Sequence, residues 1–166
     1  MRTLLAIPFF VVLVMIQTSV VTRLPLLRGF PDIILLALIA WALNDRVTTA
    51  WQWSLIAALL VGYVTAAPFF VPVAAYLITT AIARVLQRQI WKTPILAMFL
   101  TTFWGTLIYH GLSYAALQIF GTRFSILDSL DIIIIPSALL NLILALPMYA
   151  LMKEIADWLY PVQITA

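Results

Sequence analysis

The side chains best suited to chemistry gather in the apolar stretch 94–120. If this stretch is a helix with about 100° per residue, its polar positions and one glycine share an arc of roughly 140°. They are Thr102, Gly105, Thr106, Tyr109, His110 and Ser113. The arc predicts either a cavity wall, with His110 as a ligand contact, or a stripe that hydrogen-bonds to neighbouring helices. The cavity candidates are Thr106, Tyr109, His110 and Ser113.

Catalysis is disfavoured by the motifs. Residues 111–115, Gly-Leu-Ser-Tyr-Ala, faintly resemble a nucleophile elbow, but they lack the second glycine and sit inside a predicted helix. The sequence also lacks a P-loop, a metal-binding histidine pair, a dinucleotide fingerprint and any cysteine. We therefore expect no enzyme, no cofactor and no metal site.

The carboxylates lie at the predicted ends of apolar runs, where capping or interface anchoring would explain them. They are Asp32, Asp45, Asp128, Asp131, Glu154 and Asp157. A proton relay or cation carrier normally keeps a carboxylate within the membrane. The pattern therefore disfavours a pump or an ion-coupled transporter.

Composition sets the fold class. The chain has 166 residues, of which 65% are hydrophobic and 9% charged, whereas a soluble domain carries about 25% charged residues. Apolar runs in hydrocarbon must be helical, because unpaired backbone groups there cost several kcal/mol each. We expect an all-α integral membrane protein, a single polytopic transmembrane domain over residues 1–166. Its predicted spans are 4–21, 31–43, 51–67, 70–83, 94–120 and 132–152.

Two segments are less regular than the rest. Span 31–43 is short for the hydrocarbon core, so it either extends into 47–50 or is shielded by its neighbours. Pro31 suits the first turn of its helix, and Asp32 complements the positive helix start. The mixed polarity of the link 121–131 predicts a short interfacial helix.

The cations indicate topology and give no reason to expect nucleic-acid binding. Six spans place Arg2, Arg46, Arg84, Arg88, Lys92 and Lys153 on one side, and Arg23, Arg28 and Arg123 on the other. The positive-inside rule then predicts that both termini are cytoplasmic. The run Arg84, Arg88 and Lys92 is a topology determinant on this interpretation; alternatively, it binds anionic lipid head groups or an acidic partner.

Three polar residues inside spans need hydrogen-bond partners in an apolar environment: Gln17, Ser137 and Asn141. Facing inward they would hold the bundle together, and facing outward they would form a docking surface. Sequence alone does not orient a helix, so both alternatives stay open.

Several segments together resemble the bacterial rod-shape-determining protein MreD family. They are Gln17-Thr18-Ser19 late in the first span, Pro31-Asp32 before an apolar run, the basic segment Arg84–Lys92, and Ser137-Ala138-Leu139-Leu140-Asn141 in the last span. The resemblance covers essentially the whole chain. It implies docking or bundle-organising roles for Gln17, Thr18, Pro31, Asp32, Ser137 and Asn141.

The resemblance also implies a function. Members of this family are non-enzymatic components of the wall-elongation machinery in the bacterial cytoplasmic membrane. They pair with MreC, a single-span protein, and through it influence RodA, a class-B penicillin-binding protein and MreB filaments. The family is similar in fold to the substrate-binding subunits of energy-coupling-factor transporters. The alternative function is therefore a vitamin-type binding subunit, with Tyr109, His110, Ser113 and Asn141 lining its pocket.

Overall fold

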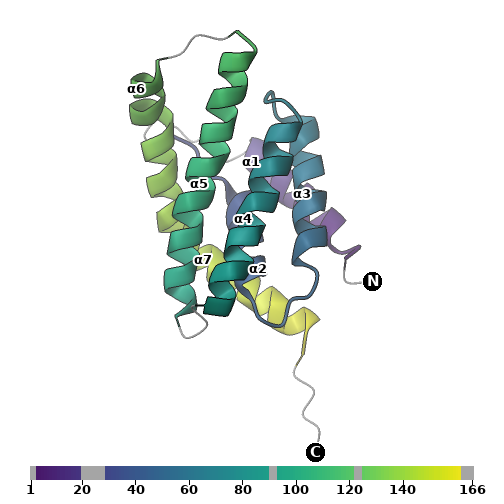
Figure 1. Cartoon of the computed structure of the whole chain (residues 1–166). Helices are drawn as coiled ribbons and strands as arrows, with labels where there is room; N and C mark the ends of the chain where they lie inside the picture. The colour runs from purple at the N-terminus through teal and green to yellow at the C-terminus, as the bar shows by residue number, and fades with distance from the viewer. Residues whose placement is uncertain (1–2, 20–28, 90–92, 122–124, 162–166) are drawn as a thin grey trace, which may run out of the picture.

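The computed structural model describes residues 3–19, 29–89, 93–121 and 125–161. The helices pack side by side into a bundle (Figure 1). They are α1 (Ala6–Ser19), α2 (Ile33–Leu43), α3 (Ala50–Val64), α4 (Phe70–Gln89), α5 (Pro94–Ile119), α6 (Ile126–Ser129), the π-helix η2 (Leu130–Ile134) and α7 (Ile135–Leu159). The all-helical prediction is therefore confirmed for the described residues.

Helix α2 is the centre of the bundle. It packs against α1, α3, α4, α5 and α7, and each of its 11 residues is buried. At about 1.5 Å per residue it is roughly 16 Å long, about half the thickness of a hydrocarbon core. It ends at Leu43 and does not continue into 47–50. Its neighbours shield it, as one of the two sequence alternatives expected.

Aromatic packing fixes the C-terminal half of α2. The Trp41 ring stacks on Trp53 of α3, with centroids 4.0 Å apart. Phe10 of α1 meets the edge of Trp53, and Tyr160 lies beside Trp41. These rings bury large apolar areas in specific orientations, so they set how α1, α3 and the end of α7 approach α2.

Three helical segments are long and apolar enough to cross a membrane: Phe70–Gln89, Pro94–Ile119 and Leu130–Leu159. The apolar helices α1, α2 and α3 are shorter. The last span is longer than the expected 132–152, because the helix continues past Met152 to Leu159. The short helix expected in the link is α6, which runs directly into η2.

A proline accounts for the π-helix. Pro136 has no backbone N–H, so the regular partner of the Ile132 carbonyl is missing. The Ile135 N–H bonds instead to the Leu130 carbonyl, five residues back. The wider turn lets the chain pass from α6 into α7 without a break.

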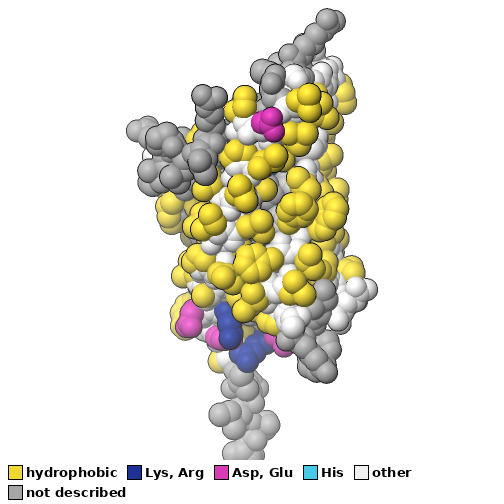
Figure 2. Space-filling view, turned by 90° about the vertical axis from the view of Figure 1, so that its left-hand side faces the viewer, with side chains coloured by type: hydrophobic (Ala, Val, Ile, Leu, Met, Phe, Trp, Pro, Cys, Tyr) yellow, Lys and Arg dark blue, Asp and Glu magenta, His cyan; other side chains and the backbone are white. Residues whose placement is uncertain are grey.

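The two ends of the bundle differ in charge. The α2–α3 loop, the C-terminal end of α4 and the C-terminal end of α7 share one end, at the bottom of Figure 1. This charged end carries Asp45, Arg46, Arg84, Arg88, Lys153, Glu154 and Asp157. Figure 2 shows hydrophobic side chains over most of the flank and charged ones mainly at this end. Such a distribution is typical of a helical membrane protein.

Gly29 allows the segment before α2 to lie directly on α7. A Cβ atom at residue 29 would lie 2.6 Å from the backbone N of Ser137. We expect Gly29→Ala to destabilise the fold by about 1–3 kcal/mol, because backbone must shift to admit the methyl group. Detergent-based thermal unfolding measures this.

Gly111→Ala is the matched control, since a Cβ there has no heavy atom within 4 Å. Alanine is favoured over glycine in a helix by about 1 kcal/mol, so this variant should be as stable as the parent or slightly more stable. Equal destabilisation by both variants would contradict the close packing of Gly29 on α7.

Candidate functional site

The residues that the sequence singled out converge on segment 29–33, which leads into α2. Gln17 of α1 contacts it twice. Its Nε2 donates to the Pro31 carbonyl at 2.7 Å, and its Oε1 accepts from the Ile33 N–H at 3.1 Å. A single side-chain amide thus satisfies a donor and an acceptor on the same stretch of backbone.

Helix α7 contacts the segment from the opposite side. Ser137 Oγ accepts from the Phe30 N–H at 3.2 Å, and Asn141 Oδ1 accepts from the Asp32 N–H at 2.7 Å. The other amide atom of Asn141, Nδ2, donates to Thr106 Oγ1 of α5 at 2.9 Å. Ser137 and Asn141 are buried, so the structure places them inside the bundle rather than on an outward-facing surface.

Asp32 is the N-cap of α2. Its Oδ1 accepts from the backbone N–H groups of Ile34 and Leu35 at 3.1 and 2.9 Å. Its Oδ2 accepts from the Tyr76 hydroxyl of α4 at 3.1 Å. The helix therefore begins at Ile33, and Pro31 precedes the cap instead of occupying the first turn as expected.

The position of Asp32 corrects a second expectation. The carboxylate lies at the start of a helix, but that start is deep in the bundle. Asn141 joins it to Thr106, which is midway along α5 (Pro94–Ile119). Asp32 thus lies at the end of an apolar run, as predicted, but this run begins inside the bundle and not at one of its ends. The argument against ion coupling, which took the ends of runs as ends of the bundle, no longer holds.

The polar arc of α5 divides into three parts. Thr102, Gly105 and Thr106 are buried against other helices. Tyr109 and His110 line a partly open cavity of about 150 Å³ whose walls also include Asp32, Tyr76 and Gln17. Ser113 instead faces a separate groove of about 350 Å³ between α5 and η2, and His110 borders both spaces. Asn141 is not among the residues lining either space.

Thr18 does not join this cluster. Its exposed hydroxyl donates to the carbonyls of Val14 and Met15 on its own helix. The structure thus brings together Gln17, Pro31, Asp32, Ser137, Asn141 and Thr106, with Tyr109 and His110 at the adjoining cavity. Sequence reasoning missed Tyr76, although a tyrosine inside an apolar helix needs a partner for its hydroxyl.

The basic run differs from residue to residue. The Arg84 guanidinium donates to the carbonyls of Asn44 and Val47, which follow the C-terminus of α2. Arg84 therefore ties helix α4 to two carbonyls of the loop that follows α2. Arg88 is exposed, on the same helical extension. Lys92 lies outside the described residues.

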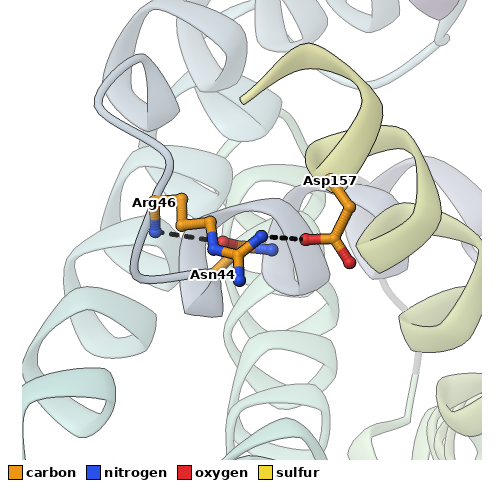
Figure 3. Close-up of polar contacts among 3 residues, drawn as sticks. All are labelled: Asn44, Arg46 and Asp157. Carbon is orange, nitrogen blue, oxygen red and sulfur yellow. Dashed lines mark hydrogen bonds and ion pairs between the residues drawn. The ribbon is translucent and has the colours of Figure 1, made fainter. Parts of the chain in front are cut away.

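A second contact at the charged end, an ion pair, joins the α2–α3 loop to α7. The Arg46 N–H bonds to Asn44 Oδ1 at 3.0 Å, and its guanidinium pairs with Asp157 at 2.6 Å (Figure 3). Both charged side chains are about 43% exposed, so solvent screens the pair and its stabilisation is small. Arg46 and Asp157 are far apart in the sequence, so no sequence pattern predicted this contact.

Comparison with protein-family models, curated proteins and solved structures gives no match to this chain. The structure itself gives the class of protein. The described residues form an all-helical bundle, and three of its helical segments are long and apolar enough to span a bilayer. These features are those of a helical membrane protein. The described residues hold no group of three or more His, Asp or Glu side chains arranged for a metal ion.

Asn141→Leu tests the attachment of α7 to α2. The variant keeps a similar volume but leaves the Asp32 N–H without its acceptor, so we expect a loss of about 1–3 kcal/mol in unfolding free energy. Ser113→Ala is the control, because in the described part of the chain its hydroxyl bonds to the Tyr109 carbonyl of its own helix and to no other helix. It should change stability by less than about 0.5 kcal/mol. Equal stability of the two variants in detergent unfolding would contradict the assignment.

Arg84→Met and Arg88→Met separate the two described arginines. Methionine retains an apolar stem in both cases. Loss of the Arg84 guanidinium removes its bonds to the Asn44 and Val47 carbonyls in the loop after α2, which should cost about 1–3 kcal/mol. Arg88→Met should fall within about 0.5 kcal/mol of the parent. If thermal unfolding of Arg84→Met matches that of Arg88→Met, Arg84 does not hold the end of α2.

Proposed function

We propose that this protein is a non-enzymatic membrane scaffold of the bacterial wall-elongation machinery. The resemblance of its sequence segments to the MreD family supports this proposal. So does the use of the polar residues in those segments: Gln17, Ser137 and Asn141 all bond to segment 29–33, and none of them is left for a substrate. This internal anchoring is the observation that carries the proposal, because it leaves a rigid interior and an apolar exterior.

The outer face of α7 is the docking surface we favour. Ile135, Leu139, Ile143 and Leu146 are each 43–69% exposed and recur at intervals of three or four residues. This spacing makes a continuous seam along one helix face, as in helix pairs. The inner face of the same helix carries Ser137 and Asn141, so α7 links a partner directly to the central helix.

The proposed partner is a single-span protein of the MreC type. Through it the scaffold would act on a RodA-type glycosyltransferase, a class-B penicillin-binding protein and, indirectly, MreB filaments. Membrane lipids would cover the remaining apolar flanks. We propose six membrane crossings in the cytoplasmic membrane, with both termini and the charged end on the cytoplasmic side. The cluster of Arg46, Arg84, Arg88 and Lys153 at that end supports this orientation.

The bonding of Asn141 favours the scaffold over a vitamin-binding subunit. The space lined by Tyr109 and His110 is about 150 Å³, below the 300–1,000 Å³ of sites for drug-sized ligands, whereas the groove lined by His110 and Ser113 is about 350 Å³ and falls within that range. Asn141, one of the expected pocket residues, is buried and bonded to Asp32 and Thr106.

The test is co-purification of a tagged single-span partner with a double variant, Leu139→Ala and Ile143→Ala. Both side chains are exposed, so the fold should remain stable. The partner should lose at least about tenfold in affinity, which corresponds to 1.4 kcal/mol. Leu55→Ala with Ile78→Ala is the control, since these exposed residues lie on α3 and α4. Equal recovery with both double variants would overturn the α7 docking surface.

Recovery of the whole complex tests the broader function. Stoichiometric co-purification of an MreC-type protein from native membranes supports the scaffold. Recovery of ABC-type ATPases with a coupling membrane subunit, or of a bound vitamin, contradicts it.

A further inference from the structure

The cavity beside Asp32 has a composition that the scaffold role does not require. It is lined by one carboxylate, by the rings of Phe30, Tyr76 and Tyr109, and by the His110 imidazole. No Lys or Arg is among the described residues that line it. Asp32 is half-buried, and a carboxylate in an apolar environment is costly unless a cation or hydrogen bonds compensate it.

The existing hydrogen bonds compensate the carboxylate unevenly. Oδ1 accepts from two backbone N–H groups at the start of α2, whereas within the described part of the chain Oδ2 accepts from the Tyr76 hydroxyl alone. Tyr76 itself lines the cavity, so the less compensated oxygen is at the cavity side of Asp32. A carboxylate oxygen has room for more than one donor. The site therefore offers one acceptor position to a cation.

The aromatic rings define the kind of cation. Tyr76 and Tyr109 stack with centroids 5.8 Å apart and an interplanar angle of 26°, and both rings line the cavity together with Asp32. Aromatic rings attract alkylammonium groups through their negative faces. A bare calcium or magnesium ion would need about six oxygen ligands, and both amide atoms of Gln17 are already bonded.

We propose that this cavity binds a small alkylammonium ion, with its charge at Asp32 and its methyl or methylene groups against Tyr76 and Tyr109. A cavity of about 150 Å³ holds a molecule of about the size of benzene. A tetramethylammonium ion is in this range. The ammonium group could belong to a free amine or to a lipid head group, and the chemistry of recognition is the same. This inference does not depend on the proposed scaffold role.

The experiment measures binding of tetramethylammonium to the purified full chain in an amine-free detergent buffer. We expect the thermal midpoint to rise with the probe concentration, above a series of sodium chloride at matched ionic strength. Calorimetric titration of the same protein measures the binding directly. A midpoint that responds equally to both salts, with no binding heat, would overturn the proposal.

Asp32→Asn separates charge from capping. Asparagine is also a good N-cap residue, so the start of α2 keeps its acceptor while the cavity loses its negative charge. We expect the affinity for tetramethylammonium to fall at least tenfold. An unchanged affinity would contradict the role of the carboxylate.

A second pair keeps the proposal testable if Asp32→Asn does not fold. Tyr109→Phe retains the ring and should retain binding, whereas Tyr109→Leu removes the ring and should weaken binding by about tenfold. Equal binding by these two variants would exclude the aromatic contact.

Nanodiscs with and without phosphatidylethanolamine distinguish a lipid head group from a free amine as the source of the ammonium group. Competition by this lipid assigns a head group, and unaltered probe binding assigns a free amine.

Discussion

The backbone at the start of α2 lies deep in an apolar bundle, where each N–H group needs an acceptor. Intrahelical bonds cannot supply these acceptors, because the first turn of any helix leaves its N–H groups open. Ser137, Asn141 and Gln17 accept from Phe30, Asp32 and Ile33, and the Asp32 carboxylate accepts from Ile34 and Leu35. The position of α2 thus depends on side chains from both α1 and α7.

This requirement explains how the remaining parts are arranged. Polar side chains of α1 and α7 point into the bundle and bond to the start of α2. At the other end of α2, Arg84 donates to the carbonyls that follow the helix. The apolar residues between these two polar ends are wrapped by five helices. With its interior held in this way, the bundle presents apolar surface along its flanks, and most of the charged side chains among the described residues lie at one end (Figure 2). A rigid body of this kind is suited to positioning partner helices in a membrane.

The sequence indicated the helical membrane class because its long apolar runs allow no other backbone structure. It also indicated that Gln17, Ser137 and Asn141 need partners, since amides and hydroxyls in hydrocarbon are costly when unpaired. The depth of Asp32 and the complete burial of α2 could not be predicted. A helix that is hydrophobic on all sides is normally buried, but in a membrane protein lipid-facing helices have the same composition. The carbonyl contacts of Arg84 and the Arg46–Asp157 pair depend on tertiary proximity alone.

The most direct measurement of the central claim is quenching of single tryptophans by lipids brominated on their acyl chains. The chain has six tryptophans, and variants that retain either Trp41 or Trp104, with the others replaced by Phe, can be placed in nanodiscs. Trp41 on α2 is fully buried and Trp104 on α5 is 52% exposed. We expect strong quenching of Trp104 and almost none of Trp41. Equal quenching of the two would mean that α2 faces lipid, which would contradict its central position.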